Sequence, residues 1–303
     1  MQNWKKLGQI YNCKPIDKYL LSHASNPLAI HLKDDIYRVF FSGRDKKNKS
    51  SVGYVDINII EKIVLSICKE VVVKYGDENS FYSHGISIGN MYKIEDKNYI
   101  QFMAWQIRNG GHWRGDIGRL ELNDKLDSLK LNPNSVYIGC NEEDKVSLSY
   151  SWIMKDEGIY KMWYGSTIDW SSQNGEMVHV IKYAISSDGE NWEKKGLAIP
   201  YEIGIAQAFS RPTVLKDNQG FHMWFSYRSG NGTKYRIGYA HSLDGIKWNR
   251  KKDSGIDVSE SGWDSEMICY PFVFEHKDKI YMLYNGNDYG KEGFGLAVLE
   301  DSE

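Results

Sequence analysis

The stretch IYRVFFSGR at residues 36–44 decides the fold, because four similar stretches follow it at a regular distance. They are NYIQFMAWQ (98–106), IYKMWYGST (159–167), GFHMWFSYR (220–228) and IYMLYNGND (280–288). The second residue of each is aromatic, and successive copies of it are 62, 61, 61 and 60 residues apart (99−37, 160−99, 221−160 and 281−221). So constant a period indicates an architecture built from equivalent structural units.

Two sets of equivalent positions in the five stretches, which we call columns, indicate which side chains share a face of the strand. Three residues after the first aromatic residue every copy has another aromatic residue, and five residues after it every copy has a small one. The aromatic column is Phe40, Phe102, Trp163, Trp224 and Tyr284, and the small column is Ser42, Ala104, Gly165, Ser226 and Gly286. Residues two apart in a strand lie on the same face. We therefore expect each stretch to be a strand whose large residues fill the space between neighbouring sheets.

Each repeat contains further strands on either side of the aromatic one. A strand ending in a polar turn precedes it, and a third strand follows a variable loop, as in SVGYVDI (51–57) and RIGYAHS (236–242). This pattern is a β-meander, and radial repetition of meanders gives a β-propeller. The sequence therefore predicts an all-β fold, a five-bladed β-propeller of four-stranded antiparallel meanders in a single domain spanning residues 1–303. The first 20 or so residues are expected to supply the outer strand of the last blade.

The composition agrees with this fold and excludes several classes of protein. The 303 residues include 28 Gly and 6 Pro, and 14% are aromatic, which favours strands and tight turns over a helical bundle. The chain has 38 Lys and Arg against 40 Asp and Glu, a net charge of −2. This balance argues against a strongly basic nucleic-acid-binding protein.

Targeting and metal-binding signals are missing from the sequence. It has no apolar stretch of about 18 residues and no apolar signal-peptide core at its start, so neither a transmembrane helix nor secretion is expected. The four cysteines are far apart and form no CxxC pair, which is typical of a cytosolic protein with free thiols. No HxH pair or glycine-rich nucleotide motif occurs in a suitable context. We therefore expect a cytoplasmic protein with no metal and no cofactor.

In a propeller the first strand of each blade lines a central channel, and the segments entering these strands form a pocket at one end. The strongest polar cluster there is WDSE at residues 263–266. In an extended chain Asp264 and Glu266 face the same side, on the order of 7 Å apart. Partial burial by Trp263 and Tyr270 would raise the pKa of one carboxyl group and suit it to general acid catalysis. The alternative is a solvated loop with hydrogen-bonding carboxylates.

Arginines form a second pattern. Arg44 and Arg228 occupy the same column of the repeat, Arg108 lies two residues past that column, and Arg211 opens the first strand of the fourth repeat. The planar guanidinium group suits recognition of carboxylate or phosphate, so converging arginines indicate an anionic substrate. The alternative is salt bridging between blades.

Histidine and aromatic residues near the strand ends suggest the ligand class. His84 precedes Gly85 at the entry to a first strand and is the histidine most suited to contact a ligand. Trp105 is one of several aromatic residues near strand ends whose faces could stack on sugar rings; the others are Trp113, Trp170, Tyr227 and Tyr289. Together at the mouth of a propeller these features make a carbohydrate the leading ligand.

The sequence resembles the five-bladed propeller glycoside hydrolases, namely family 43 arabinanases and xylosidases, family 32 and 68 fructosidases, and family 130 mannoside phosphorylases. The resemblance covers nearly the whole chain. It rests on the five meanders, on the SxDGxxW turns at residues 186–192 and 242–248, and on proline-containing entries to first strands. These entries are Asn26-Pro27, Arg211-Pro212 and Tyr270-Pro271.

The resemblance also implies site residues. In the hydrolases an Asp before the first-blade proline serves as nucleophile or base, and Asn26 occupies the matching position here. A neutral amide cannot take that role. If Glu266 or Asp264 is the acid, the second carboxylate could come from Asp45 or Asp169. Contact with substrate is also expected from Asn26, Tyr270 and Asp288.

Three functions follow from these observations, and the sequence leaves open whether the protein is an enzyme. The first is glycoside hydrolase-like chemistry that makes or breaks a glycosidic bond in the channel, which the family resemblance favours. The second is a transferase or phosphorylase acting on a phosphorylated or nucleotide-activated sugar, which the arginines and the missing Asp favour. The third is a non-catalytic propeller that binds a sugar.

Overall fold

The computed structural model describes residues 2–107, 111–131, 136–230 and 232–300, and over these residues the chain is mainly strand. The strands follow one another in antiparallel meanders. Three sheets contain four strands each, and a larger sheet contains eight. The prediction of an all-β fold with four-stranded antiparallel sheets is therefore confirmed.

The larger sheet consists of two meanders in succession. The first contains β2 (Ser22–Lys33), β3 (Ile36–Arg44), β4 (Ser50–Asn58) and β5 (Ile63–Ile67). The second contains β6 (Gly85–Ile94), β7 (Lys97–Ile107), β8 (Trp113–Leu122) and β9 (Leu129–Leu131). A single parallel bridge between Ser50 of β4 and Gly85 of β6 joins them.

The other three sheets are separate meanders. One contains β10 (Ser147–Asp156), β11 (Ile159–Asp169), β12 (Val178–Ser186) and β13 (Glu193–Leu197). The next contains β14 (Ser210–Asp217), β15 (Gly220–Tyr227), β16 (Arg236–Ser242) and β17 (Asn249–Arg250). The last contains β18 (Cys269–His276), β19 (Lys279–Asn285), β20 (Gly293–Leu299) and the N-terminal β1 (Trp4–Asn12), with the short helix α1 (Asn287–Gly290) between β19 and β20.

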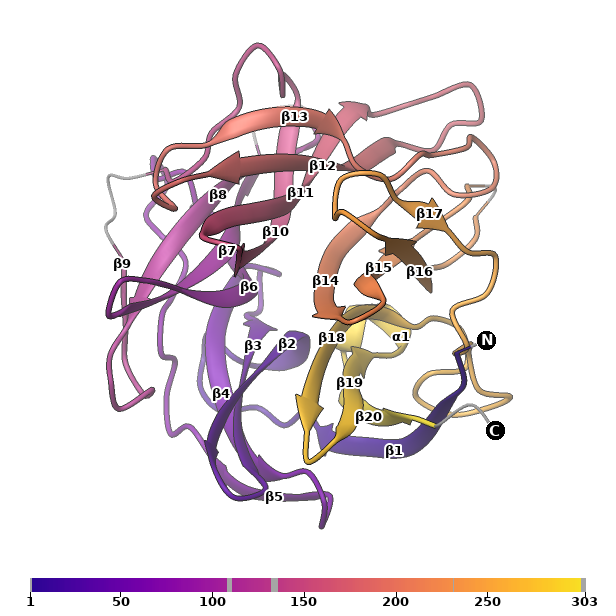
Figure 1. The fold of residues 1–303 in the computed structure, drawn as a ribbon. Coiled ribbons are helices and arrows are strands. Elements are labelled where there is room, and N and C mark those ends of the chain that lie inside the picture. The colour runs from indigo at the N-terminus through magenta and orange to yellow at the C-terminus, as the bar shows by residue number, and fades with distance from the viewer. Residues whose placement is uncertain (1, 108–110, 132–135, 231, 301–303) are drawn as a thin grey trace.

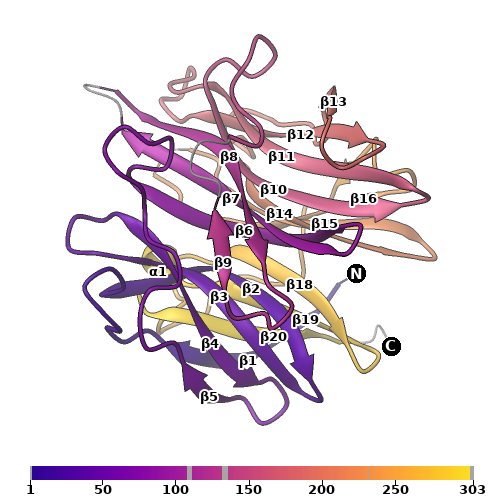
Figure 2. The same cartoon turned by 90° about the vertical axis from the view of Figure 1, so that its left-hand side faces the viewer.

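The first strands of the meanders surround a common centre (Figure 1). In chain order β2 contacts β6, β6 contacts β10, β10 contacts β14, β14 contacts β18, and β18 contacts β2. The last strands of the meanders lie outside, so that β5 and β13 are at opposite edges of the molecule (Figure 2). This arrangement is propeller-like, and it brings residues from every sheet to one central region.

The aromatic column of the repeat forms the core between the sheets. Each of its five members is at most 1% exposed: Phe40, Phe102, Trp163, Trp224 and Tyr284. Trp163 packs with Phe221 of the following meander, and Trp224 packs with Tyr284 of the meander after it. Burial of a large apolar side chain stabilises the fold by about 1.5–3 kcal/mol. The strand and core assignments made from the repeat are confirmed.

The N-terminal strand completes the last sheet. β1 pairs with β20 in antiparallel register from Trp4 with Leu299 to Asn12 with Gly293. The Trp4 ring meets the Trp224 ring edge to face at 5.9 Å. The expectation that the first residues supply the outer strand of the last meander is therefore confirmed.

Three first strands contain an irregularity directly before a proline. Asn26, Arg211 and Tyr270 have φ angles of 58°, 49° and 55°, and the strand pairing shifts register at each of them. A left-handed backbone is unfavourable for these residues, and all the more so before proline. Bulges of this kind turn a side chain out of the regular alternation of a strand. These three side chains therefore need not follow the face that a simple alternation would assign.

The bulge directs the Arg211 side chain toward two other meanders, and its hydrogen bonds connect the three. Its guanidinium group donates hydrogen bonds to the backbone carbonyls of Pro27 (2.8 Å), Pro271 (3.0 Å) and Tyr270 (3.4 Å). The residue is 3% exposed, and burial lowers its pKa to about 10, so that it remains charged at neutral pH. Arg211 was expected to contact substrate, but its bonds to these backbone carbonyls make it part of the scaffold.

Replacing Arg211 by methionine should lower the free energy of unfolding by about 2–4 kcal/mol, because buried carbonyl groups lose their donors. Urea unfolding followed by tryptophan fluorescence measures this change. The matched control is Arg250→Met, since Arg250 makes an ion pair with Glu202 at 3.9 Å that is worth at most about 1 kcal/mol. Equal effects of the two substitutions would contradict the scaffold role.

Candidate functional site

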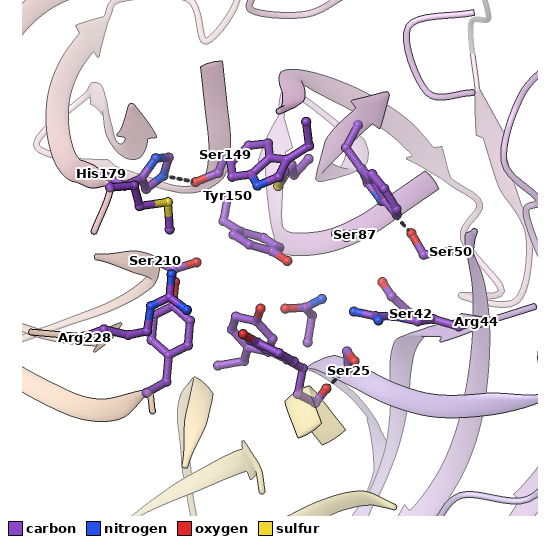
Figure 3. A pocket seen from close by; sticks show the side chains of 18 residues that line it. Ser25, Ser42, Arg44, Ser50, Ser87, Ser149, Tyr150, His179, Ser210 and Arg228 are labelled. Atoms are coloured by element: carbon purple, nitrogen blue, oxygen red, sulfur yellow. Dashed lines mark hydrogen bonds between the residues drawn. The ribbon is translucent and has the colours of Figure 1, made fainter. Parts of the chain in front are cut away.

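A cavity of about 250 Å³ lies where the first strands converge, and we call it the central cavity. All the meanders contribute to its wall. Its lining residues are Ser25, Asn26, Ser42, Arg44, Ser50, Ser87, Met103, Trp105, Trp113, Ser149, Tyr150, Met177, His179, Ser210, Arg228, Tyr235, Tyr270 and Tyr289. Figure 3 shows these side chains as sticks around the cavity.

Four of the lining serines occupy equivalent places in successive repeats. Ser25 and Ser87 lie twelve residues before the first aromatic residue of their repeats (37−25 and 99−87), and Ser149 and Ser210 lie eleven before it (160−149 and 221−210). Cys269 takes the fifth place (281−269) and is fully buried outside the lining. The four serines place a ring of hydroxyl groups in the cavity wall. The sequence analysis missed this ring of hydroxyl groups, although the repeat alignment contained it.

Tyrosines close one side of the central cavity. The ring of Tyr270 lies 5.7 Å from that of Tyr150, 6.4 Å from that of Tyr235 and 6.3 Å from that of Tyr289. Burial raises the pKa of Tyr150 and raises that of Tyr270 well above its ordinary value. These phenols therefore stay protonated at neutral pH. They offer a ligand apolar ring faces together with neutral hydroxyl groups.

The charged groups in the wall are both arginines, and they reach in from opposite sides (Figure 3). Arg228 is compensated, because it donates a hydrogen bond to the Glu176 carboxylate at 2.9 Å and lies 4.8 Å from the centre of the Tyr235 ring. For the Arg44 guanidinium group the described residues supply no hydrogen-bond or ion-pair partner. None of the described lining residues is Asp or Glu. Among the described residues the charge of Arg44 is therefore uncompensated in the cavity wall.

A buried histidine contacts one of the cavity serines. His179 on β12 places Nε2 2.6 Å from Ser149 Oγ (Figure 3). Its Nδ1 lies 2.7 Å from Thr167 Oγ1. Burial lowers the pKa of His179 to about 3, so that the imidazole is neutral at physiological pH. The sequence favoured His84 as the histidine in contact with a ligand, and only the fold reveals that His179 lies in the cavity wall.

The structure brings part of the predicted site together. Five of the residues expected to contact substrate line the central cavity: Asn26, Arg44, Trp105, Arg228 and Tyr270. His84 lies beside the cavity, with its ring 5.8 Å from that of Trp105 and its Nδ1 accepting a hydrogen bond from the backbone of Ile107. Arg108 lies outside the described residues.

The two carboxylates predicted to act as catalytic groups do not line the central cavity. Asp264 is 3% exposed, and its Oδ2 accepts hydrogen bonds from Lys6 Nζ (2.8 Å) and Tyr284 Oη (3.0 Å). Glu266 is exposed and forms an ion pair with Lys234. The prediction assumed an extended chain, whereas residues 261–266 form turns and bends. Asp264 therefore anchors the N-terminal strand, and the expectation of a general acid in the channel is corrected.

The other predicted carboxylates also lie away from the lining residues. Asp45 accepts hydrogen bonds from the backbone of Lys47 and Lys49, both at 2.8 Å, and from Tyr75 Oη at 3.0 Å. Asp169 is exposed and caps the backbone of Ser171, and Asp288 is exposed in α1. The described residues therefore provide no carboxylate pair across the central cavity.

Comparison with known proteins places the chain in a family. It is 38% identical over 301 residues to uncharacterized protein Rv1502 of Mycobacterium tuberculosis strain H37Rv, and the match covers 98% of this chain and 99% of the relative. Uncharacterized protein MT1551 of Mycobacterium tuberculosis strain CDC 1551 matches to the same extent. The chain belongs to the family of these mycobacterial proteins. None of the protein-family models that were compared matches it.

Solved structures with similar folds are glycoside hydrolase-like propellers. A protein described as a glycoside hydrolase has a TM-score of 0.74 at 12% identity, with 98% of this chain and 93% of that chain covered. A member of the GH130 family of mannoside phosphorylases, described as containing glycoside hydrolases that target β-1,2 mannosidic linkages in Candida mannan, has a TM-score of 0.64 at 15% identity, with 98% and 96% covered.

A third similar structure is the sucrose-6-phosphate hydrolase from Lactobacillus gasseri. Its TM-score is 0.65 at 13% identity, and the match covers 96% of this chain and 62% of that chain. At these identities the three likenesses show the fold alone. They confirm the resemblance to the propeller glycoside hydrolases that the repeat and the turns indicated.

Two further properties of the described residues concern membranes and metal ions. These residues contain no helix that is both long enough and apolar enough to span a membrane. They also contain no group of three or more His, Cys, Asp or Glu side chains placed to hold a metal ion.

The corrected positions of the two carboxylates predict different effects for two conservative substitutions. Asp264→Asn should lower the free energy of unfolding by about 1–3 kcal/mol, because Lys6 loses its charged partner in a partly buried setting. Glu266→Gln should change it by less than about 0.5 kcal/mol, because the ion pair with Lys234 is exposed to solvent. Urea unfolding of both variants checks this, and a larger effect of Glu266→Gln would contradict it.

Proposed function

We propose that the protein binds an anionic carbohydrate, such as a sugar phosphate, in its central cavity. The observation that carries this proposal is the uncompensated guanidinium group of Arg44 in a wall whose described residues include no carboxylate. A charge at the edge of a partly desolvated cavity is unfavourable without a partner. An anionic ligand supplies that partner through the planar fork of the guanidinium group.

The rest of the wall suits a sugar. Serine hydroxyl groups from four repeats and the amide of Asn26 offer donors and acceptors for ligand hydroxyl groups. The Oδ1 atom of Asn26, in the cavity wall, is buried and has no hydrogen-bond partner among the described residues. The rings of Trp105, Trp113 and the tyrosines offer faces for the C–H surfaces of a sugar. This combination of apolar faces and a few convergent polar groups is typical of a small-molecule site.

The neighbours in fold support a carbohydrate ligand. Their descriptions include a glycoside hydrolase, a family of mannoside phosphorylases and a hydrolase of sucrose 6-phosphate, which is itself a phosphorylated sugar. A shared fold does not establish a shared reaction. It does make a carbohydrate the class of ligand with most support.

The cavity favours phosphate-dependent chemistry over hydrolysis by two carboxylates. Such hydrolysis uses a pair of Asp or Glu residues about 5–9.5 Å apart, and the described lining residues contain none. A phosphate held by Arg44 can leave or attack without a second protein carboxylate. We therefore favour transfer of an activated sugar, or binding without turnover, over glycoside hydrolysis.

The proposed function goes with a proposed blade number and a proposed cellular location. If the larger sheet counts as two blades, joined only at the bridge between Ser50 and Gly85, the meanders form a five-bladed propeller. We propose that this propeller is one domain spanning residues 1–303 and that the protein acts in the cytoplasm, where activated sugars are made.

Isothermal titration calorimetry tests the ligand class. Wild-type protein should bind glucose 1-phosphate or UDP-glucose at least about tenfold more tightly than glucose, because a charge-assisted bidentate contact is worth about 1.5–3 kcal/mol. Arg44→Ala should remove this preference, and Arg44→Lys should restore only part of it because the planar fork is lost. The matched control Lys47→Ala removes one exposed positive charge from the same hairpin and should leave binding unchanged.

Two results would overturn the proposal. One is equal affinity of wild-type protein for glucose and for its phosphorylated forms. The other is hydrolysis of an aryl glycoside that disappears in Glu266→Gln, since this would restore the catalytic role of that carboxylate. Assays for release of free sugar, phosphate and nucleotide during the titrations distinguish transfer from binding without turnover.

A further inference from the structure

The hydrogen bonds of His179 define which way the hydroxyl group of Ser149 faces. Three neutral groups lie in a row, with the imidazole of His179 in the middle. Thr167 Oγ1 lies 2.7 Å from His179 Nδ1, and Ser149 Oγ lies 2.6 Å from His179 Nε2. Each is at most 2% exposed. Only Ser149 and His179 also line the central cavity, while Thr167 lies behind them.

The three groups carry one more hydrogen-bonding proton than the two hydrogen bonds between them require. A neutral imidazole carries one N–H, and each hydroxyl group carries one O–H. The two contacts use two of these three protons. The third proton therefore belongs either to Thr167 or to Ser149, depending on which ring nitrogen of His179 is protonated.

The surroundings of the two hydroxyl groups decide between these possibilities. If Nδ1 carries the proton, it donates to Thr167, and the Thr167 hydroxyl proton is left in a buried place where the described residues supply no other acceptor. If Nε2 carries the proton, Thr167 donates to Nδ1, Nε2 donates to Ser149, and the spare proton is that of Ser149. Buried donors without acceptors are rare and destabilising, whereas Ser149 faces the cavity.

We infer that His179 is the neutral tautomer protonated at Nε2, and that it thereby directs the Ser149 hydroxyl proton into the central cavity as a hydrogen-bond donor to an anionic ligand. Ser149 is then a binding residue and His179 a positioning residue. The row Thr167 to His179 to Ser149 runs in one donor direction, which strengthens the last donor by polarisation. A donor of this kind suits an oxygen of phosphate or carboxylate, so the inference rests on the proposed function and deepens it.

A glycine on β11 makes space for the contact between Ser149 and His179. Gly165 pairs with Ser149 across the two strands. A Cβ atom at Gly165 would lie 2.0 Å from Ser149 Oγ and 2.5 Å from His179 Nε2. The close approach of serine and histidine is therefore possible only because residue 165 has no side chain.

The same geometry argues against a serine nucleophile with a histidine base. That arrangement needs Ser149 to donate its proton to Nε2, which is the tautomer that leaves the Thr167 proton without an acceptor. It also needs an imidazole that readily takes up a proton, and burial holds the pKa of His179 near 3. The pair is therefore suited to binding.

Nitrogen-15 NMR of histidine-labelled wild-type protein tests the tautomer directly. The His179 signals are identified by their loss in His179→Gln. We expect the shift of a protonated nitrogen at Nε2 and of an unprotonated nitrogen at Nδ1. A protonated Nδ1 would overturn the inference whether or not any ligand is known, and thermal melting checks that His179→Gln folds, so that the lost signals are those of His179.

Calorimetry with glucose 1-phosphate tests the role of Ser149. Ser149→Ala should weaken binding about tenfold, as expected for loss of one hydrogen bond to a charged group. The matched control is Ser151→Ala on the same strand, because Ser151 is buried, has no hydrogen-bond partner among the described residues and is not one of the residues that line the cavity. It should bind as wild type does, and thermal melting checks that both variants fold.

The outcomes separate this inference from the proposed function. If wild-type protein binds glucose 1-phosphate and Ser149→Ala binds it equally well, the inference fails and the proposed function stands. If wild-type protein binds neither glucose 1-phosphate, UDP-glucose nor inorganic phosphate, both fail. If Ser149→Ala alone weakens binding and Nε2 is protonated, both are supported.

Discussion

Packing of large aromatic side chains between neighbouring sheets is the interaction on which the rest of the structure depends. Residues such as Phe40, Trp163 and Tyr284 are almost completely buried, and apolar burial is the main favourable contribution to folding. It holds the sheets around one centre, where their first strands converge. The cavity at that centre is lined by serines from four of the repeats together with larger aromatic and arginine side chains. The cavity and its ring of hydroxyl groups are therefore consequences of the same packing.

The polar residues outside the cavity stabilise the ring of sheets. Asp264 receives hydrogen bonds from Lys6 on β1 and from Tyr284 on β19, so it links the two ends of the chain within the last sheet. Arg211 links the first strands of three meanders through their carbonyl groups. Buried charged groups close to a cavity resemble a catalytic site in sequence, yet here their hydrogen bonds are used by the scaffold.

The fold of this chain resembles that of glycoside hydrolases, whereas the wall of its central cavity is the basis of the function that we propose. The glycoside hydrolase-like propeller is present, while the described wall contains Arg44, the paired Arg228 and neutral hydroxyl groups in place of carboxylates. Fold alone does not specify chemistry, because function depends on the side chains placed on it. Asn26 before the first proline already indicated this difference, since its amide cannot serve as nucleophile or base.

The sequence by itself determined the strands, the repeat, the aromatic core and the use of the N-terminal strand, because these depend on local periodicity and on burial of large side chains. It also singled out Arg44, Arg228, Asn26, Tyr270 and Trp105, all of which line the central cavity. Only the tertiary structure decided where the other polar groups lie. Bulges before proline send Asn26 and Tyr270 into the cavity and Arg211 into the scaffold, although all three occupy similar places in the chain. His179 acquires its place from Ser149 and Thr167 on two other strands, and such contacts are invisible to local pattern because they depend on how distant segments pack.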